Sequence, residues 1–307
     1  MGVIAVDCGG SNLTVGRYGT DGDGEPSAKR ATPREAAAIP GAIVDAIGPL
    51  VGPRVEAVGI GVAGLVDHEA GVLVWSPHAR GGGVAIGAEV AAATGLPVVV
   101  DNDANLAALA EARRGAGSGE RMVLFIGLGT GIGGGLVVAG RVERGRGFLG
   151  EVGHMVVDPA GPRCACGRRG CWEALVSGTA LGRAAGELAS ADRSGLLARL
   201  AAGTVPRGEH LVAAAGAGDR AAGEALAAAG AWLGRGLANL VAVLDPDVIV
   251  VGGAAAGAGE ALLGPARAKM AETVEGGRHR RPTPVRPARF GAGAGLVGAA
   301  LAAGEVR

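Results

Sequence analysis

The sequence predicts an α/β protein built from two halves of similar design. Short segments rich in Val and Ile, which favour strands, alternate along the chain with Ala-rich segments, which favour helices. The order apolar strand, glycine turn, apolar strand occurs twice, first as "VIAVDCGGSNLTVGRY" and again as "MVLFIGLGTGIGGGLVV". This weak internal repeat indicates that each half offers one glycine turn to a cleft between them.

The first half begins with two strands joined by a tight turn. Apolar runs flank "DCGGSN", which is typical of a strand, turn and strand, and a polar, glycine-rich break is expected at 19–34. The segment "GAGSGE" after residue 114 reads as a linker. In chain order we expect strands at 3–6 and 13–18, a helix near 35–50, a strand at 55–64, a helix near 85–94, a strand at 97–103 and a helix at 104–114.

The second half begins with a segment that needs a choice between membrane helix and hairpin. Residues 122–140 carry no charge over 19 positions, enough to span a bilayer by length alone. Seven of them are glycine, and each glycine costs a helix interior about 0.5–1 kcal/mol relative to alanine, so we expect a hairpin of two strands. Beyond it we expect a helical region at 174–202, a helix at 220–243, a strand at 247–253, a helix to about 275, a basic loop with prolines and a closing helix in "GAGAGLVGAALAAG".

Composition and charge favour a globular protein that binds a small soluble ligand. The chain has 307 residues, long enough for two domains, and is 49% hydrophobic but only 2% aromatic. Its 29 basic and 29 acidic residues balance, so no nucleic-acid partner and no polybasic membrane anchor are expected. The start "MGVIAVDCGG" lacks the basic and long apolar segments of a signal peptide, which favours a cytoplasmic location.

The two glycine turns are candidate phosphate sites. Turns between strands expose consecutive backbone N–H groups, which can bind phosphate oxygens where no side chain is in the way. Gly9-Gly10-Ser11 and Gly127 to Gly135 could together hold a nucleoside triphosphate, although in a chain with 60 glycines they could equally be ordinary tight turns. Asp7, at the end of the first strand, could hold Mg²⁺ through water or form an Asx-type turn.

Polar residues cluster where the strand expected at 97–103 passes into a helix. The run "VDNDANLAALAE" places Asp101, Asn102, Asp103 and Asn105 at this junction, a common position for binding groups in α/β proteins. Three of the four could serve only as helix caps. Alternatively, a carboxylate here could accept the proton of an attacking sugar hydroxyl, as the base of a kinase does.

Three of the four cysteines lie within eight positions. Cys164, Cys166 and Cys171, together with His154, supply three sulfurs and one nitrogen, the ligand set of a closed tetrahedral zinc site. A reactive or disulfide-forming cluster is the alternative, but Cys164 and Cys166 are too close in sequence to pair easily, and a cytoplasmic setting keeps thiols reduced. Cys8 stands apart and is expected to be a small buried apolar residue.

Taken together, these motifs resemble those of the ROK family of sugar kinases, in its bacterial glucokinase branch. "DCGGSN" is similar to the family's first phosphate motif, "GIGVAGLVD" to the segment beside the sugar, "DNDANLAALAE" to the catalytic motif and "LGTGIGGGLVVAG" to the second phosphate motif. "GEVGHMVV" followed by "CACGRRGCWE" matches the sugar and zinc signature in spacing. The resemblance covers nearly the whole chain. It implies an α/β, actin-like (ribonuclease H-like) fold with a small lobe at 1–116, rejoined by a helix at about 291–307, and a large lobe at 117–290 carrying the zinc knuckle.

The resemblance also implies an activity and a set of site residues. The chain would transfer the γ-phosphoryl group of ATP, bound with Mg²⁺ in the cleft, to the 6-hydroxyl of a hexose, with glucose the expected substrate. Asp103 would be the catalytic base, His154 would both bind sugar and ligate a structural Zn²⁺, and a homodimer or tetramer is expected. The implied sugar-binding residues are Gly64, Asn102, Asp103, Glu151, His154 and Glu173; the nucleotide-binding residues are Asp7, Gly9, Gly10, Ser11, Asn12, Gly129, Thr130, Gly131, Gly252 and Gly253; the zinc ligands are His154, Cys164, Cys166 and Cys171.

The chain departs from the family pattern at several motifs. Ser11-Asn12 stands where the family usually has Thr-Lys, which removes one positive charge near the phosphates, and "DxGGS" also resembles the polyphosphate-using glucokinases. The loop "WSPHARGGGVAIG" replaces the usual Asn- and Trp-containing sugar loop, and "GAGAGLVGAA" lacks the common Asn-Asp. The choice of hexose and of ATP or polyphosphate as donor is therefore open.

Other functions of the family are alternatives to a glucokinase. An N-acetylhexosamine or fructose kinase would use the same motifs on a different sugar. The family's repressors carry a winged helix-turn-helix ahead of the first phosphate motif, which here begins at Asp7, so DNA binding is not expected. A sugar-binding regulatory protein with weak catalysis is a further alternative, and the retained pair Asn102-Asp103 argues against it.

Overall fold

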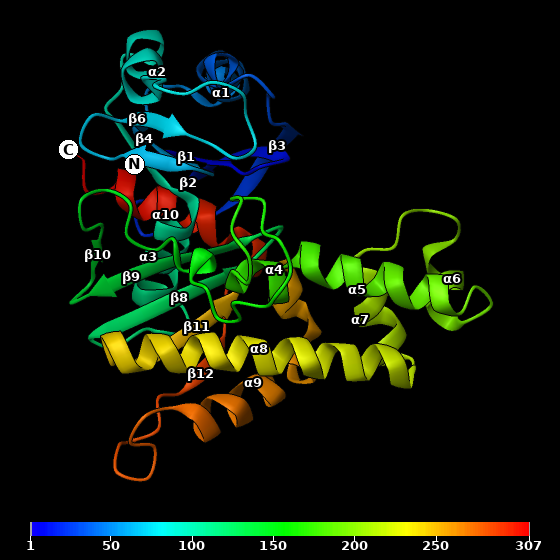
Figure 1. The fold of residues 1–307 in the computed structure, drawn as a ribbon. Coiled ribbons are helices and arrows are strands. Elements are labelled where there is room, and N and C mark those ends of the chain that lie inside the picture. The colour runs from blue at the N-terminus through cyan, green and yellow to red at the C-terminus, as the bar shows by residue number, and fades with distance from the viewer. Residues whose placement is uncertain (1, 307) are drawn as a thin grey trace. The chain divides into compact units, whose positions relative to one another are not determined.

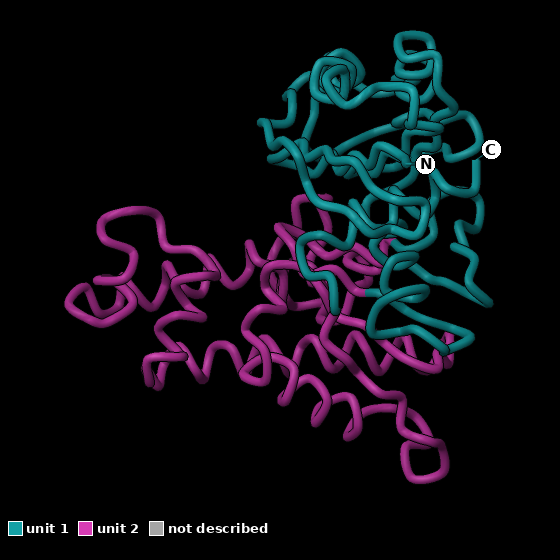
Figure 2. The backbone as a smooth tube through the Cα atoms, turned by 180° about the vertical axis from the view of Figure 1, so that it is seen from behind, with its two compact units in different colours: residues 1–125, 135–150, 289–307 teal, residues 126–134, 151–288 magenta. Residues whose placement is uncertain are grey.

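The computed structural model describes residues 2–306, and the chain divides by its internal contacts into two compact units (Figure 2). Unit 1 comprises 1–125, 135–150 and 289–307, and unit 2 comprises 126–134 and 151–288. Strands and helices alternate along the chain, which confirms the α/β class. The lobe boundaries expected from the sequence, 1–116 with about 291–307 and then 117–290, stay a prediction.

Unit 1 is built on a five-stranded sheet with the strand order β3-β2-β1-β4-β7 (Figure 1). β1, β2 and β3 are antiparallel neighbours, whereas β1, β4 and β7 run parallel. Because parallel strands end at the same edge of a sheet, the register places Cys8 beside Val62 and Val62 beside Asn102. The carboxyl ends of β1 and β7, which carry Asp7 and Asn102, therefore lie at one edge. The strands are β1 (Gly2–Cys8), β2 (Asn12–Tyr18), β3 (Gly24–Ala31), β4 (Val55–Val62) and β7 (Val98–Asn102).

Helices cover both faces of this sheet, as the alternation along β1 requires. Ile4, Val6 and Cys8 belong to one buried cluster with residues of α1 and α2, whereas Val3 and Ala5 belong to another with residues of α3 and α10. Successive strand residues point to opposite faces, so each face receives its own helix pair. These helices are α1 (Ile39–Ile47), α2 (Ile86–Thr94), α3 (Asp103–Arg114) and α10 (Ala294–Ala303), with short 3₁₀ turns η1 (Ala36–Ala38), η2 (Gly48–Leu50) and η5 (Gly291–Gly293) beside them.

The closing helix α10 approaches its neighbours at glycine positions. A Cβ added to Gly59 of β4 would lie 2.0 Å from the carbonyl oxygen of Ala299, and one added to Gly298 would lie 1.8 Å from that of Leu106. Neither position leaves room for a side chain, so glycine is what allows the backbones of α10, β4 and α3 to come this close.

The break expected at 19–34 is wrong, because the segment contains the edge strand β3. Seven of its eight residues are exposed, so it lacks the apolar alternation that marks a half-buried strand. It is held instead by antiparallel pairing along β2. The two-stranded β5 (Leu65–Asp67) and β6 (Val72–Trp75) were likewise not expected.

A second five-stranded sheet has the order β10-β9-β8-β11-β12. The uncharged segment 122–140 forms β8 and β9 with the glycine turn between them, which confirms the expected hairpin. The short strands β10 and β12 are too brief to leave a pattern in the sequence. The strands are β8 (Met122–Leu128), β9 (Ile132–Val138), β10 (Arg141–Glu143), β11 (Val248–Gly252) and β12 (Val285–Pro287).

Unit 2 is mostly helical. The helical region expected at 174–202 is broken at Ser177, whose hydroxyl accepts the N–H of Ala180 as the cap of α5, and again after α5 ends. The long helix α8 lies along α9 (Figure 1), and Cβ atoms at its Gly230 and Gly234 would meet α9 carbonyl oxygens at 2.4 and 2.3 Å. The elements are η3 (Val152–His154), α4 (Trp172–Val176), α5 (Gly178–Ala191), α6 (Leu196–Ala201), α7 (Gly208–Gly216), α8 (Arg220–Leu244), η4 (Ala254–Ala258) and α9 (Glu260–Thr273).

By length and composition alone α8 could cross a membrane. However, 56% of its most apolar stretch is buried inside the protein, as in the core helix of a globular domain. Among residues 2–306 it is the one helix that meets both criteria.

Candidate active site and metal centre

The junction of β7 and α3 carries the candidate catalytic residues Asn102 and Asp103. The side-chain oxygen of Asn102 accepts the N–H groups of Ala104 and Asn105 at 2.8 and 3.2 Å, so the expected capping role is confirmed for this residue. Its side-chain nitrogen donates to the carbonyl of Gly64 at 3.0 Å, which brings two predicted sugar-binding residues together. Asp103 follows as the first residue of α3.

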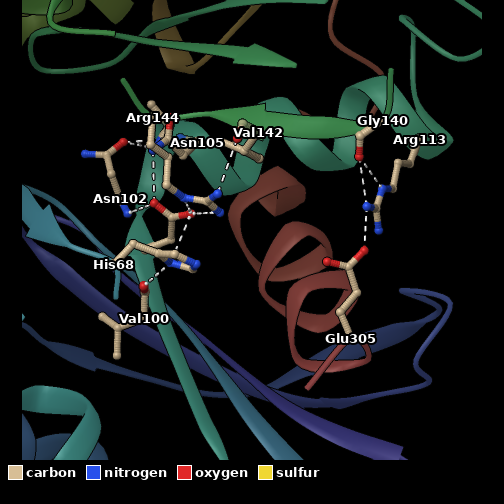
Figure 3. A network of polar contacts seen from close by, with 11 residues as sticks. His68, Val100, Asn102, Asn105, Arg113, Gly140, Val142, Arg144 and Glu305 are labelled. Atoms are coloured by element: carbon tan, nitrogen blue, oxygen red, sulfur yellow. Dashed lines mark hydrogen bonds and ion pairs between the residues drawn. The ribbon is translucent and has the colours of Figure 1, made fainter. Parts of the chain in front are cut away.

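A buried carboxylate, Asp101, organises this junction. Figure 3 shows the network of polar contacts to which the labelled residues His68, Asn102, Asn105 and Arg144 belong. Its Oδ1 accepts the Asn102 N–H at 2.8 Å and the side chain of Asn105 at 2.9 Å. Its Oδ2 accepts two hydrogen bonds from Arg144, from Nε at 2.9 Å and Nη2 at 2.7 Å. The imidazole of His68 lies 3.6 Å from the same oxygen, and its Nδ1 lies 2.8 Å from the carbonyl oxygen of Val100. Asp101 therefore positions the backbone that carries Asn102 and Asp103, rather than facing a ligand itself.

Two acidic groups at the edge of the unit 1 sheet have displaced pKa values. Burial, and then the charge of Asp103, raise the pKa of Asp7 to about 7. Burial also raises the pKa of Asp103, although the N–H of Ala104, 2.9 Å from Oδ1, and the positive charge of His78 oppose that rise. A carboxyl group whose pKa is raised is a stronger base once ionised, which suits the acceptance of a proton from a hydroxyl group.

The first glycine turn has the backbone arrangement of a phosphate-binding nest. Gly9 donates its N–H to the carbonyl of Asn12 at 2.9 Å. Thr32 donates its hydroxyl to the carbonyl of Gly9 at 2.7 Å and its N–H to the carbonyl of Ser11 at 3.1 Å. The N–H groups of Gly10 and Ser11 have no hydrogen-bond acceptor within residues 2–306. Two consecutive free donors on a turn held from behind can bind an anion.

The second glycine turn, between β8 and β9, is built in the same way. Gly129 donates its N–H to the carbonyl of Gly131 at 3.0 Å. The N–H groups of Gly178 and Thr179, the first residues of α5, donate to the carbonyl oxygens of the turn. Gly178 donates to Gly129 at 2.9 Å and Thr179 donates to Thr130 at 3.3 Å. This leaves the N–H groups of Thr130 and Gly131 without an acceptor in the described part of the chain.

The predicted adenosine segment lies against this second turn. Gly253 follows the last residue of β11, Gly252, with a φ of 86°. A Cβ added to Gly253 would lie 2.5 Å from the carbonyl oxygen of Leu128, the residue before the turn. Glycine is thus required there both by conformation and by space.

The three clustered cysteines and His154 form one compact donor set. Their ligand atoms all lie within 4.8 Å of one another, with Cys166 Sγ 3.5 Å from Cys171 Sγ and Cys164 Sγ 3.8 Å from His154 Nδ1. Ligands of a tetrahedral zinc ion, with Zn–S near 2.3 Å, would stand about 3.5–3.8 Å apart, so the arrangement fits that metal. A hydrogen bond from the backbone N–H of Arg168 lowers the pKa of the Cys166 thiol to about 6, which favours the thiolate that binds metal.

The two predicted sugar-binding glutamates of unit 2 lie beside this donor set. Glu151 Oε2 lies 3.9 Å from Nε2 of His154, the ring nitrogen not turned toward Cys164. Glu173 Oε1 lies 3.7 Å from Cys164 Sγ, and its Oε2 accepts the N–H of Ile132 at 3.0 Å. The knuckle, defined as His154 with Cys164, Cys166 and Cys171, therefore adjoins Glu151, Glu173 and the second glycine turn within one unit.

With this geometry in place, similarity to known proteins identifies the family. Residues 3–305 match the ROK family. The chain belongs to the ROK family. A glucokinase from Streptomyces coelicolor is 39% identical over 98% of this chain and 97% of its own length, and an N-acetylmannosamine kinase from Escherichia coli O1:K1 is 34% identical over 100% of both. The crystal structure of a ROK family glucokinase from Streptomyces griseus in complex with glucose and AMPPNP covers 99% of each chain at 40% identity, with a TM-score of 0.90.

Membership of the ROK family confirms the expected actin-like sugar kinase fold. The structure brings Gly64 to Asn102, and Glu151 and Glu173 to the knuckle. It also shows residues near these ROK motifs that the sequence did not single out, namely His68, Arg144 and Thr32, together with His78. His68, Arg144 and Thr32 each reach a partner that is distant in sequence, and His78 lies in the loop that departs from the family pattern.

Proposed function

We propose that this chain is an ATP-dependent glucokinase, which transfers the γ-phosphoryl group of ATP to the 6-hydroxyl of glucose. The observation that carries the proposal is the similarity, over 99% of both chains at 40% identity, to the Streptomyces griseus glucokinase solved in complex with glucose and AMPPNP. The free N–H groups of the two glycine turns and the basic carboxylate of Asp103 supply the groups that such a reaction needs.

In this proposal unit 1 supplies the base and the first phosphate site. Asp103 takes the proton of the sugar's 6-hydroxyl as that oxygen forms its bond to the γ-phosphorus, and the electron pair of the breaking P–O bond leaves with ADP. Asn102 and Gly64 bind neighbouring hydroxyls, and the N–H groups of Gly10 and Ser11 bind phosphate oxygens. Mg²⁺, when bound, would neutralise phosphate charge, and Asp7 would hold it through water.

Unit 2 carries the other residues predicted to bind sugar and phosphate. Glu151, His154 and Glu173 bind hydroxyls of the hexose, while Thr130 and Gly131 bind phosphate oxygens and Gly252-Gly253 contacts adenosine. His154 would hold the metal through Nδ1, which lies toward Cys164, and would keep Nε2 for a hydroxyl. A structural Zn²⁺ held by His154, Cys164, Cys166 and Cys171 would fix the orientation of these side chains.

The proposal also includes expectations about partners, location and oligomeric state. The proposal includes no nucleic-acid partner and no membrane partner, as the balanced charge of the sequence led us to expect. A cytoplasmic location and a homo-oligomeric state remain part of the proposal, as does a role in glycolysis.

The test is release of ADP by zinc-replete protein with Mg-ATP, compared across glucose, mannose, fructose, N-acetylglucosamine and N-acetylmannosamine, with polyphosphate as an alternative donor. We expect turnover with glucose and ATP. The variant Asp103→Asn keeps the size of the side chain but removes the base, and we expect its kcat to fall by at least about 10²-fold. An unchanged kcat would remove Asp103 from the mechanism.

A second candidate, an N-acetylmannosamine kinase, is favoured by the 34% identity that extends over 100% of the chain. The same assay separates the two candidates. A higher kcat/KM for N-acetylmannosamine than for glucose would make N-acetylmannosamine the proposed substrate and leave the proposed phosphoryl transfer unchanged. Absence of turnover with every sugar, in folded and zinc-loaded protein, would overturn the kinase proposal.

A further inference from the structure

An exposed histidine outside the predicted site, His78, lies directly over the first glycine turn. A Cβ added to Gly10 would stand 2.7 Å from Cγ and Cδ2 of the His78 ring and 2.9 Å from its Nδ1. The imidazole therefore covers the face of the turn on which a side chain at position 10 would stand. Its ring nitrogens have no hydrogen-bond partner within residues 2–306, so they are available to a ligand.

The loop that carries His78 is hydrogen-bonded to the residue that follows β4. The N–H of His78 donates to Ser76 Oγ at 3.2 Å, and the buried Ser76 hydroxyl donates to the carbonyl of Ala63 at 2.8 Å. A Cβ added to Gly64 would lie only 2.3 Å from the carbonyl oxygen of Trp75, so the loop packs on the backbone there. The position of His78 is thus set by the residues that follow β4.

His78 is also near the proposed base. Its charge is among the influences that oppose the raised pKa of Asp103. Since the side chain touches the phosphate turn at Gly10 and acts electrostatically on Asp103, it borders the path from the phosphate donor to the hydroxyl that Asp103 deprotonates. All three residues belong to unit 1, so this arrangement does not depend on the placement of unit 2.

The turn itself has no cation that could serve there. The segment "DCGGSN" contains one acidic and no basic side chain, and its two free N–H groups carry only partial charge. Phosphoryl transfer spreads negative charge over the three equatorial oxygens of the moving group, and cationic donors at those oxygens lower the barrier. A histidine imidazolium can donate such a hydrogen bond.

We propose that His78 is a catalytic residue that donates a hydrogen bond to the γ-phosphoryl group and so replaces a cation that the turn lacks. This rests on the proposed kinase function. His78 keeps its proton throughout: the hydroxyl proton goes to Asp103, the sugar oxygen bonds to phosphorus, and ADP leaves with the electron pair of the broken bond. Its part is to bind charge that develops on the transferring group.

Histidine NMR tests the contact without requiring turnover. The chain has five histidines, so a ¹⁵N-labelled sample gives a small set of imidazole signals, and His78→Ala identifies the one that belongs to His78. We expect Mg-AMPPNP to shift the His78 signal and Mg-ADP to leave it in place, because only the former has a γ-phosphoryl group. If the chemical shift of the His78 signal does not change with Mg-AMPPNP, or changes equally with Mg-ADP, the proposal is overturned. This holds whether or not the chain proves to be a kinase.

Steady-state kinetics then test the catalytic role. We expect His78→Ala to lower kcat at least about tenfold with little change in the KM for glucose or in Tm, since the side chain is exposed. His78→Lys should recover part of the loss, because it restores a cation. His279→Ala removes an exposed histidine from a turn of unit 2 and should match the wild type. An unchanged kcat, or a raised KM for glucose with kcat intact, which would make His78 a sugar contact, would contradict the proposal.

Discussion

At the scale of single residues, the chain holds acidic groups where water solvates them poorly. Asp7 is the clearest case, because burial and the nearby Asp103 together raise its pKa from 3.8 to about 7. A Cβ added to Gly295 of α10 would stand 3.0 Å from the Asp7 carboxyl group, so the helix leaves it little space. Such a group is costly for folding and is typical of positions kept for function.

The cost of ionised Asp7 predicts a pH-dependent stability. Because its pKa is higher in the folded than in the unfolded chain, the folded state binds more protons between pH 4 and 7, and Asp7 lowers the free energy of unfolding progressively as pH rises through that range. The size of the shift corresponds to a few kcal/mol. We expect Asp7→Asn, in buffer without Mg²⁺ or nucleotide, to raise Tm by at least about 3 °C at pH 8.

The pH profile distinguishes this cause from a general gain in packing. The advantage of Asp7→Asn should shrink from pH 8 to pH 5, since the wild-type carboxyl group is then protonated when folded. Equal gains at both pH values would contradict the account. Asp21→Asn changes an exposed aspartate of the same unit and should show no such trend.

At the scale of elements, the junction of β7 and α3 depends on a residue distant in sequence. Arg144, which follows β10, donates two hydrogen bonds to Asp101, a side chain that is only 2% exposed. The sequence placed the polar cluster at 101–105 correctly at a strand-to-helix junction, because composition and capping are local signals. It could not show that Asp101 faces inward, since its partner lies 43 positions away.

Removal of Arg144 should therefore disturb both folding and catalysis. Arg144→Met leaves a buried carboxylate without its main partner, a change that costs roughly 3–5 kcal/mol at fully buried sites and less here because Arg144 is 28% exposed. We expect a Tm lower by several degrees and a reduced kcat, since Asn102 and Asp103 lose their support. Thermal unfolding and the ADP assay measure both.

Matched variants make this prediction specific. Arg146→Met removes an exposed arginine two residues further on and should change neither quantity. Asp101→Asn combined with Arg144→Met removes the unpaired charge and should recover part of the lost stability. If Arg144→Met behaves like Arg146→Met, the hydrogen bonds to Asp101 do not hold the junction.

At the scale of the whole molecule, the sequence predicted features that depend on neighbouring residues and missed those that depend on residues distant in the chain. The fold class, the hairpin at 122–140 and the proximity of His154 to the three clustered cysteines follow from periodicity, glycine content and spacing over short distances. The edge strand β3 was missed because its residues are exposed, and Glu111 because its role is nonlocal. This fully buried glutamate accepts the N–H groups of Ala116 at 2.8 Å and Phe290 at 2.8 Å, joining α3 to the chain just before α10.

The knuckle gives a prediction about how the two units depend on the metal. His154 and the three cysteines belong to unit 2, whereas Asp103 and the first glycine turn belong to unit 1. Cys166→Ser removes one thiolate, and structural zinc sites contribute directly to folding, so we expect loss of about one zinc per chain and a lower Tm. The KM for glucose should rise more than the KM for ATP, because Glu151 and Glu173 adjoin the knuckle.

Elemental analysis, thermal unfolding and kinetics test these effects, with Cys8→Ser, in the core of unit 1, as the variant that should keep its zinc. Full zinc content in Cys166→Ser, or a metal-free wild type with unchanged Tm and activity, would show that these four side chains do not form a structural zinc site.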